Sequence, residues 1–432
     1  MPSRLPARSI SPWPPEVAVH EVLITRQPVF DRHLDTVAYE LHYGQPASTL
    51  QSAASSNAQR FLDTVLEIGL DALVGVRLAI VSLPPPVIVS LLPDLLPLLP
   101  ADRLVLATGP DDLREPELRE VIRRLLARGC RLLLDLEEHA LFTPLPFEDA
   151  DIIRLSLRYA RAQLDRRGAL ERWLTERLAD VASYRSGGLR VLVSDVQDYR
   201  EFVRSRDLGV DLFQGDFLFR PILVRGRRQP VSSAALFLLA RLSDPAIEFE
   251  EVERLLAQDV QLTYKLLKLV NAVWFARRTR VESLRQALLV LGLRSVAAWV
   301  AVLVLAGIER KPVELVRTAL VRARMCELVA GALGVSSRET AFLTGLLSVL
   351  DAALDVPLAD ALAELPLTSE VTEALLYHRG PLGRVLAAVL SYEVGHWSPL
   401  ADLPITPMLL TEAFIDALAF AAQALVGLDL AP

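Results

Sequence analysis

Two patterns of apolar and polar positions divide this chain. Over residues 20–223, short apolar runs rich in leucine and β-branched side chains alternate with longer stretches whose apolar residues recur at helical spacing. Short continuous apolar runs predict buried strands, and the stretches between them predict helices. We therefore expect strands at 22–30, 36–41, 77–83, 103–108, 130–136, 151–157, 189–195 and 210–215.

The alternation of strands and helices predicts the architecture of this first half. Helical patterns cover residues 54–73, 111–128 and 160–184, and Gly129 stands where a glycine commonly ends a helix. Continuous apolar strands separated by helices are typical of parallel strands covered on both faces. Seven or eight such units in about 200 residues favour a (β/α)8 TIM-like barrel over a doubly wound sheet. No glycine-rich phosphate loop follows any strand.

The pattern changes after a basic break at residues 224–230, which we interpret as a linker. From 231 to 432 every apolar pattern has the helical period, which predicts an all-helical domain. Ser283 and Gly292 match the two caps of one helix. Asn271 interrupts an apolar helix face, so we expect it to be hydrogen-bonded and to fix how two helices meet.

Bulk composition excludes several classes of protein. Of the 432 residues, 52% are apolar, yet the longest uncharged run is too short to cross a bilayer and the run at 80–100 is broken by prolines. The net charge of −7 argues against broad binding to nucleic acid. Cys130 and Cys326 match no metal or redox spacing, which favours a cytoplasmic protein. Residues 1–19 are predicted to be a disordered proline-rich leader.

Two segments of the first half carry a resemblance to a known family. TRQPVFDRHLDTVAYEL at 25–41 resembles the opening of EAL domains, whose barrels hydrolyse cyclic di-GMP, and places Glu40 at the signature glutamate of that family. FQGDFLFRP at 213–221 resembles the closing segment of the same barrel. The resemblance covers residues 20–223 and implies a barrel whose opening lies at the strand ends.

The second half resembles the HDOD domain. The segment 259–292 follows the pattern of that family, and FLTGLLSVLDAAL at 342–354 stands where related HD phosphohydrolases keep histidine and aspartate ligands. The order of the two domains is similar to that of a class of bacterial regulators. The resemblance therefore implies a signalling protein, although a fold does not carry a function by itself.

The strand ends test whether the barrel keeps the chemistry of its relatives. Two-metal hydrolysis of a phosphodiester needs several converging carboxylates. By the resemblance, four polar positions remain as a vestigial ligand pocket: Glu40, Asp135, Arg154 and Gln214. Others are replaced, namely by Val81, Ala107, Leu136, Ser156 and Ser194. A shift of one residue would leave Asp195 or Glu137 as further candidates. We predict no metal site and no catalytic residue.

Structural roles for the surviving residues stand beside this hypothesis. Glu40 alone at a barrel opening is more often solvated or hydrogen-bonded than a metal ligand. Gln214 and Gly215 are expected to shape a tight turn at the end of a strand. Arg154 and Asp135 are expected to pair with each other in place of the lost metal site.

The helical half offers little metal chemistry. It contains His378 and His396, neither beside an aspartate, and we expect His378 to cap a helix. Asp351 and Asp355 are one helical turn apart and are interpreted as a solvated face. The candidate interaction surface consists of Trp274 and the basic residues that follow it, Arg277, Arg278 and Arg280. Alternatively, these arginines complement the dipole at the C-terminal end of the preceding helix.

These observations lead to one functional hypothesis with two alternatives. The chain is predicted to be a non-catalytic, cytoplasmic signal-transduction regulator that acts as a protein-interaction scaffold in cyclic di-GMP-related signalling. It is expected to bind unidentified signalling proteins, without a cofactor and without membrane insertion, and a homodimer is left open. The first alternative is a receptor that binds cyclic di-GMP without hydrolysis. The second is a residual phosphodiesterase that depends on Mg²⁺ or Mn²⁺.

Overall fold

The structure is a computed structural model of the whole chain. It describes residues 22–44, 52–136, 149–163, 169–185, 187–221, 247–257, 260–273, 281, 283–308, 311–335, 337–363 and 365–430. The predicted leader at 1–19 and the predicted linker at 224–230 lie outside the described residues, so both boundaries stay predictions.

The first half is a closed barrel with its strands in sequence order from β1 to β8, as predicted. Its strands are β1 (Leu23–Phe30), β2 (Thr36–Gly44), β3 (Leu78–Ser82), β4 (Leu104–Thr108), β5 (Arg131–Asp135), β6 (Ile152–Ser156), β7 (Arg190–Ser194) and β8 (Leu212–Gln214). Each strand overlaps the range that the sequence predicts, and β2 continues to Gly44, beyond its predicted end at residue 41.

The direction of β1 departs from the expected all-parallel barrel. β1 pairs antiparallel with both β2 and β8, and the neighbouring pairs from β2 to β8 are parallel. The connection from Asp31 to Asp35 is a short turn closed by hydrogen bonds to the Asp31 side chain. A parallel crossover needs a dozen or more residues, so a turn of this length permits only a hairpin.

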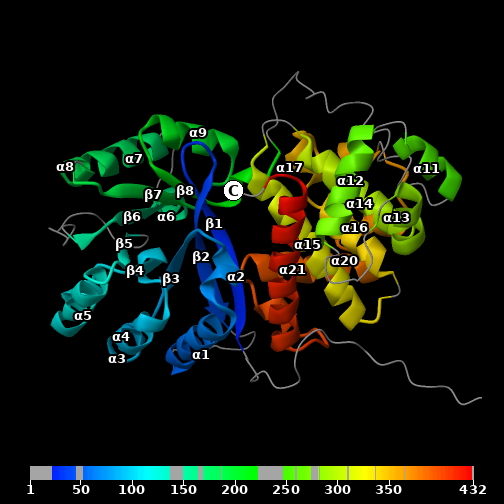
Figure 1. Cartoon of the computed structure of the whole chain (residues 1–432). Helices are drawn as coiled ribbons and strands as arrows, with labels where there is room; N and C mark the ends of the chain where they lie inside the picture. Colours follow the sequence, from blue (N-terminus) through cyan, green and yellow to red (C-terminus); the bar gives the residue numbers. More distant parts are fainter. Residues whose placement is uncertain are drawn as a thin grey trace, which may run out of the picture.

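Helices cover the outside of the barrel (Figure 1). They are α1 (Ser52–Ile68), α2 (Leu70–Val74), α3 (Pro85–Ser90), α4 (Leu92–Leu95), α5 (Pro116–Leu126), α6 (Leu157–Gln163), α7 (Ala169–Asp180), α8 (Ala182–Arg185) and α9 (Tyr199–Asp207). Outward strand side chains pack against these helices. The alternate side chains form a separate apolar cluster in the barrel interior: Val29, Ala38, Ile80, Val105, Ala107, Leu133, Ile152, Leu192 and Leu212.

The second half is helical, as predicted. Its described helices are α11 (Phe249–Ala257), α12 (Val260–Val273), α13 (Leu284–Leu291), α14 (Leu293–Ala306), α15 (Val313–Ala332), α16 (Arg338–Leu347), α17 (Leu350–Leu354), α18 (Leu358–Ala363), α19 (Ser369–Tyr377), α20 (Gly380–Glu393) and α21 (Pro407–Gly427). The predicted caps of α13 are confirmed, because the Ser283 hydroxyl accepts from Gln286 N–H and Gly292 follows the helix at φ 79°.

Asn271 connects α12 to the chain that precedes α13. Its amide nitrogen donates to the carbonyls of Leu267 and Val281, at 2.8 Å each, and its oxygen accepts from Val281 N–H at 2.9 Å. All polar atoms of this half-buried side chain are therefore used. The expected hydrogen bonding of Asn271 is confirmed, and its partner outside α12 is the segment that leads into α13.

Helix α21 is long and apolar enough to cross a bilayer by length and composition alone. In the structure, 56% of its most apolar window is buried, and it packs against α12, α15 and β1. Figure 1 shows α21 running beside the β1–β2 hairpin, between the barrel and the other helices. Its apolar composition is that of a central helix in a packed core.

Three buried or half-buried hydrogen bonds join the helical half to strand β1. The Tyr392 hydroxyl donates to the Ile24 carbonyl at 2.5 Å, and the Thr411 hydroxyl donates to the Val22 carbonyl at 3.0 Å. The Thr25 hydroxyl donates to the Glu393 carbonyl at 3.2 Å. Strand β1 therefore belongs to the barrel and to the contact between the two halves.

Candidate functional site

The four polar residues predicted as a vestigial pocket come together at one end of the barrel interior. Asp135 and Gln214 end β5 and β8, and Arg154 lies in the middle of β6. Glu40 lies in β2 opposite Ile80, which belongs to the interior cluster. Because side chains alternate along a strand, these positions share the inward face.

Arg154 is the centre of this cluster. One terminal nitrogen lies 2.7 and 2.8 Å from the two carboxylate oxygens of Glu40, and the other donates to Asp135. The predicted pairing of Arg154 with Asp135 is therefore present, and Glu40 joins it. The Glu40 and Arg154 side chains are each only 7% exposed, so the pair lies away from bulk water. Charge-assisted contacts of this geometry are strong where water is excluded.

Gln214 completes the arrangement around Glu40. Its amide nitrogen donates to Glu40 Oε2 at 2.6 Å and lies 3.1 Å from Gln27 Oε1. Gln27 faces Glu40 across the β1–β2 ladder. The structure thus adds a residue that the strand pattern did not single out, since its role depends on the closure of β1 against β8.

The charge state of Glu40 follows from these contacts. Burial alone would raise the pKa of this carboxyl group. The guanidinium of Arg154 and the hydrogen bonds from Arg154 and Gln214 outweigh burial, so the pKa of Glu40 lies below its ordinary value. His42 adds to the effect, with Nε2 3.8 Å from Glu40 Oε2. Glu40 is therefore ionised and hydrogen-bonded, as the structural interpretation expected.

Gly215 shapes the end of β8, as predicted. Its φ is 148°, and a Cβ atom there would lie 2.2 Å from the carbonyl oxygen of Val196. Val196 N–H in turn donates to the Gln214 carbonyl at 3.0 Å. The close approach of the two backbones holds Gln214 in place. The Gln214 side chain, in contrast, points to Glu40 and contributes to the cluster as well as to the turn.

The assignment of Val81 to the barrel opening needs a correction. Val81 belongs to the main core outside the barrel, whereas Ile80 belongs to the interior cluster. Alternation therefore turns Ser82, the last residue of β3, toward the opening in place of Val81. Leu136 also lies in the main core. Ala107 does lie on the inward face of β4, as expected.

Asp195, directly after β7, has hydrogen-bond partners of its own. Ser156 Oγ lies 3.0 Å from Asp195 Oδ2, and Ser194 Oγ lies 3.4 Å from the same oxygen. Arg161 donates to the Asp195 carbonyl at 2.9 Å. The two serines that replace family positions thus contact Asp195, one of the two carboxylates that a shift of register would bring in. The other, Glu137, lies outside the described residues.

A divalent metal pair does not fit the residues around Glu40. Both oxygens of Glu40 accept hydrogen bonds, and Arg154 already brings a positive charge to Glu40 and Asp135. The β3 and β4 ends supply a serine and an alanine, where such a site needs strong oxygen donors. Among the residues that the structure describes, no three His, Cys, Asp or Glu side chains gather in a metal-binding group.

The helical half differs from expectation at its aspartates. Asp355 is not on a solvated face: its side chain is 8% exposed and pairs with Lys311 at 2.7 Å. Burial raises the pKa of the half-buried Asp351. Ser348, in the HD-like segment, accepts a hydrogen bond from Arg322 at 3.3 Å and donates to the Gly345 carbonyl at 2.7 Å. These polar groups are engaged in structural contacts.

His378 follows α19 as its cap in a left-handed conformation, which confirms the predicted role. The candidate interaction surface of Trp274, Arg277, Arg278 and Arg280 lies outside the described residues. Its function stays a prediction.

Comparison with known proteins agrees with the two-part architecture. Residues 230–364 match the model of the HDOD domain family. A Vibrio cholerae protein named cyclic di-GMP phosphodiesterase CdgJ is 28% identical over 91% of this chain and 89% of its own length. The uncharacterized Bacillus subtilis protein YuxH is 26% identical over 88% of this chain and 93% of its own.

Solved structures similar to this chain include an EAL domain protein from Listeria monocytogenes, at 16% identity and a TM-score of 0.35. The alignment covers 46% of this chain and 87% of the Listeria chain. The PaMucR phosphodiesterase in complex with cyclic di-GMP is 15% identical with a TM-score of 0.38, over 46% of this chain and 96% of that one. The chain is thus a closed eight-stranded barrel followed by a helical region, and the match to the HDOD domain model covers residues 230–364.

Proposed function

We propose that this protein is a non-catalytic regulator of cyclic di-GMP-related signalling, located in the cytoplasm, which acts as a scaffold for other signalling proteins. The observation that carries the proposal is the position of Arg154. Its guanidinium binds Glu40 and Asp135, the carboxylates that a metal centre at this opening would use. The fixed positive charge of Arg154 thus occupies the position where an enzyme of this kind would need an exchangeable metal ion.

The energetics of the cluster support this view. A metal ion would have to displace Arg154 from a buried ion pair, and removal of one partner from such a pair typically costs about 3–5 kcal/mol. The displaced guanidinium would also lie beside the incoming divalent cation, which repels it. Glu40, Asp135 and Arg154 therefore form, together with Gln214, an ion-pair and hydrogen-bond network that stabilises the opening.

The name of the Vibrio cholerae relative supplies the competing proposal of a phosphodiesterase. The two proposals differ in one measurable step. An active enzyme converts cyclic di-GMP to the linear dinucleotide in a reaction that depends on Mg²⁺ or Mn²⁺, whereas a scaffold produces none.

The test incubates the purified full-length protein with cyclic di-GMP, with and without Mn²⁺, and separates the products by chromatography. We expect no linear dinucleotide above a protein-free blank. Turnover that requires Mn²⁺ and disappears in Glu40→Ala, while Glu120→Ala retains it, would overturn the proposal. Glu120 is a suitable control because it lies on the exposed face of α5, paired with Arg124.

Binding of cyclic di-GMP without turnover is a second candidate function, and two exposed cations favour it. Arg158 follows β6 with its side chain 75% exposed, 3.9 Å from Asp195. Arg220 follows β8 with its side chain 54% exposed. Phosphate groups are bound by such arginines without any metal. Calorimetric titration with cyclic di-GMP distinguishes this receptor from the scaffold, because saturable heat that is lost in Arg158→Gln supports the receptor alone.

A further inference from the structure

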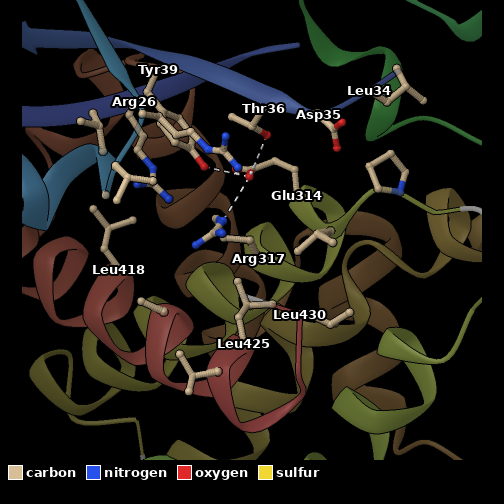
Figure 2. Close-up of a pocket in the computed structure, with 18 of the residues that line it drawn as sticks. Arg26, Leu34, Asp35, Thr36, Tyr39, Glu314, Arg317, Leu418, Leu425 and Leu430 are labelled. Carbon is tan, nitrogen blue, oxygen red and sulfur yellow. Dashed lines mark hydrogen bonds and ion pairs between the residues drawn. The ribbon is translucent and has the colours of Figure 1, made fainter. Parts of the chain in front are cut away.

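A second site lies between the barrel and the helical half, away from the Glu40 cluster. It is a cavity of about 650 Å³, within the range of small-molecule sites. Its walls come from the β1–β2 hairpin and α2 on one side, and from α15 and α21 on the other. Figure 2 shows side chains from both halves converging on it. Cavities between domains are common positions for ligands.

The polar side of the cavity is a network centred on Glu314. This carboxylate accepts from the Tyr39 hydroxyl at 2.8 Å, from the Thr36 hydroxyl at 3.3 Å and from Arg317 Nε at 3.1 Å. Burial raises the pKa of Tyr39, and the nearby Glu314 carboxylate raises it further. The Tyr39 hydroxyl therefore keeps its proton and remains a donor. Figure 2 shows these three contacts. Glu314 is therefore satisfied by the protein itself.

Positive charge exceeds negative charge in this network. Arg26 lies 4.0 Å above the Tyr39 ring and donates to the Leu73 carbonyl, and it pairs with no carboxylate among the described residues. Burial lowers the pKa of Arg26 by more than Tyr39 and Glu314 raise it, and the nearby charge of Arg317 lowers it further. Two arginines thus face a single buried glutamate. An anion in the cavity would balance the second arginine.

The opposite side of the cavity is apolar. Helix α21 contributes Leu418 and Leu425, and Leu430 follows it (Figure 2). Val76 and Val426 line the same space and are 75% and 59% exposed. Exposed aliphatic groups beside a cationic pocket suit a ligand with an apolar body.

We infer that this cavity binds a small amphiphilic anion, with one carboxylate or phosphate head at Arg26 and Arg317 and an aliphatic body along α21. Arg317 uses Nε for Glu314, and its terminal nitrogens donate to no other group in the part of the chain that the structure describes, so they can meet the head group. The ligand would contact both halves of the molecule and stabilise their association. This site is independent of the nucleotide chemistry proposed for the barrel opening.

The experiment uses full-length protein and calorimetric titration with octanoate and with octyl phosphate, which together identify the head group. Three compounds serve as controls: acetate and inorganic phosphate lack the aliphatic body of the ligand, and octanol lacks its negative charge. We expect one octanoate or octyl phosphate per chain to bind saturably, at least about tenfold more tightly than any of these controls. Equal binding of octanol, or no saturable binding of either probe, overturns the inference.

Two variants locate the binding. Arg26→Met removes the charge, and Ala422→Trp fills the cavity from an exposed position of α21 and leaves both arginines in the sequence. Each should weaken binding about tenfold or more, whereas Arg123→Met, an exposed arginine of α5, should bind as the wild type does. If Ala422→Trp binds as tightly as the wild type, the site is elsewhere and the inference fails, whatever Arg26→Met does to folding.

Discussion

At the scale of single residues, the barrel opening is governed by one buried arginine shared between two carboxylates. A buried carboxylate is costly unless it is paired and hydrogen-bonded. Glu40 meets both conditions through Arg154 and Gln214, and Asp135 meets the first through Arg154. The stability of this region therefore depends on Glu40, Asp135, Arg154 and Gln214. The apolar pattern of the strands identifies these residues only as polar positions within apolar runs.

Replacing Arg154 by methionine should lower the free energy of unfolding by about 3–5 kcal/mol, because it leaves the buried Glu40 and the half-buried Asp135 without their cation. Urea unfolding followed by circular dichroism measures the change. Arg123→Met, whose side chain is 58% exposed, should change it by less than about 0.5 kcal/mol. Similar losses in the two variants would contradict the structural role of Arg154.

The pH dependence of stability provides a second check on Glu40. Its folded pKa is lowered, so its stabilising contribution is present above the unfolded carboxyl pKa of about 4.3 and is lost as pH falls through the folded value. The difference in unfolding free energy between wild type and Glu40→Gln should therefore shrink on acidification below about pH 4. Denaturant titrations at a series of pH values test this, and a difference that grows on acidification would refute it.

At the scale of elements, the β1–β2 hairpin serves two sites at once. Gln27 and Glu40 face the barrel opening, whereas Arg26 and Tyr39, their neighbours in sequence, line the cavity between the halves. Successive side chains of a strand point to opposite faces, so the same two strands contribute residues to the barrel opening on one face and to the cavity on the other. A change of register in this hairpin would disturb the two sites together.

Turn geometry at the end of β8 leads to the third prediction. Gly215→Ala should destabilise the protein by about 2–4 kcal/mol, since it adds backbone strain and a clash with the Val196 carbonyl. Gly188→Ala is the matched control: its φ is +99°, but a Cβ atom there meets nothing within 4 Å. Thermal unfolding should therefore show a clearly larger loss for Gly215→Ala. Equal losses would mean that strain alone, and not the close approach to Val196, matters.

At the scale of the whole molecule, strand β1 couples the two halves. Tyr392 and Thr411 donate to carbonyls of β1 from helices α20 and α21, and Arg322 of α15 lies 5.8 Å from the ring of Phe219 beyond β8. Burial raises the pKa of Tyr392, which keeps its hydroxyl a donor. The halves therefore meet through satisfied polar contacts as well as apolar ones.

Removing two of these contacts should loosen both halves together. The double variant Tyr392→Phe and Thr411→Val loses two buried hydrogen bonds, each with a net value of about 1 kcal/mol. Hydrogen exchange read by mass spectrometry should become faster in β1 and also in α20 and α21. Tyr264→Phe, at a side chain 65% exposed, should leave exchange unchanged. Faster exchange confined to the helices would show that β1 does not depend on this contact.

Much of this architecture is present in local sequence signals. The strand positions, the caps Ser283 and Gly292, and the glycine at the end of β8 follow from periodicity and from backbone preferences of neighbouring residues. The four residues of the vestigial pocket were found by resemblance to a family motif, and barrel closure then brought them together.

Only the tertiary structure decided the rest. The antiparallel direction of β1, the outward face of Val81, the burial of Asp355 against Lys311 and the contact of Tyr39 with Glu314 all depend on segments far apart along the chain. Sequence periodicity reports which face of an element is apolar, but not which distant element covers it. Arg154 shows both limits: its pairing with Asp135 on the neighbouring strand was expected from the sequence, whereas its contact with Glu40 of β2 depends on the closure of the barrel.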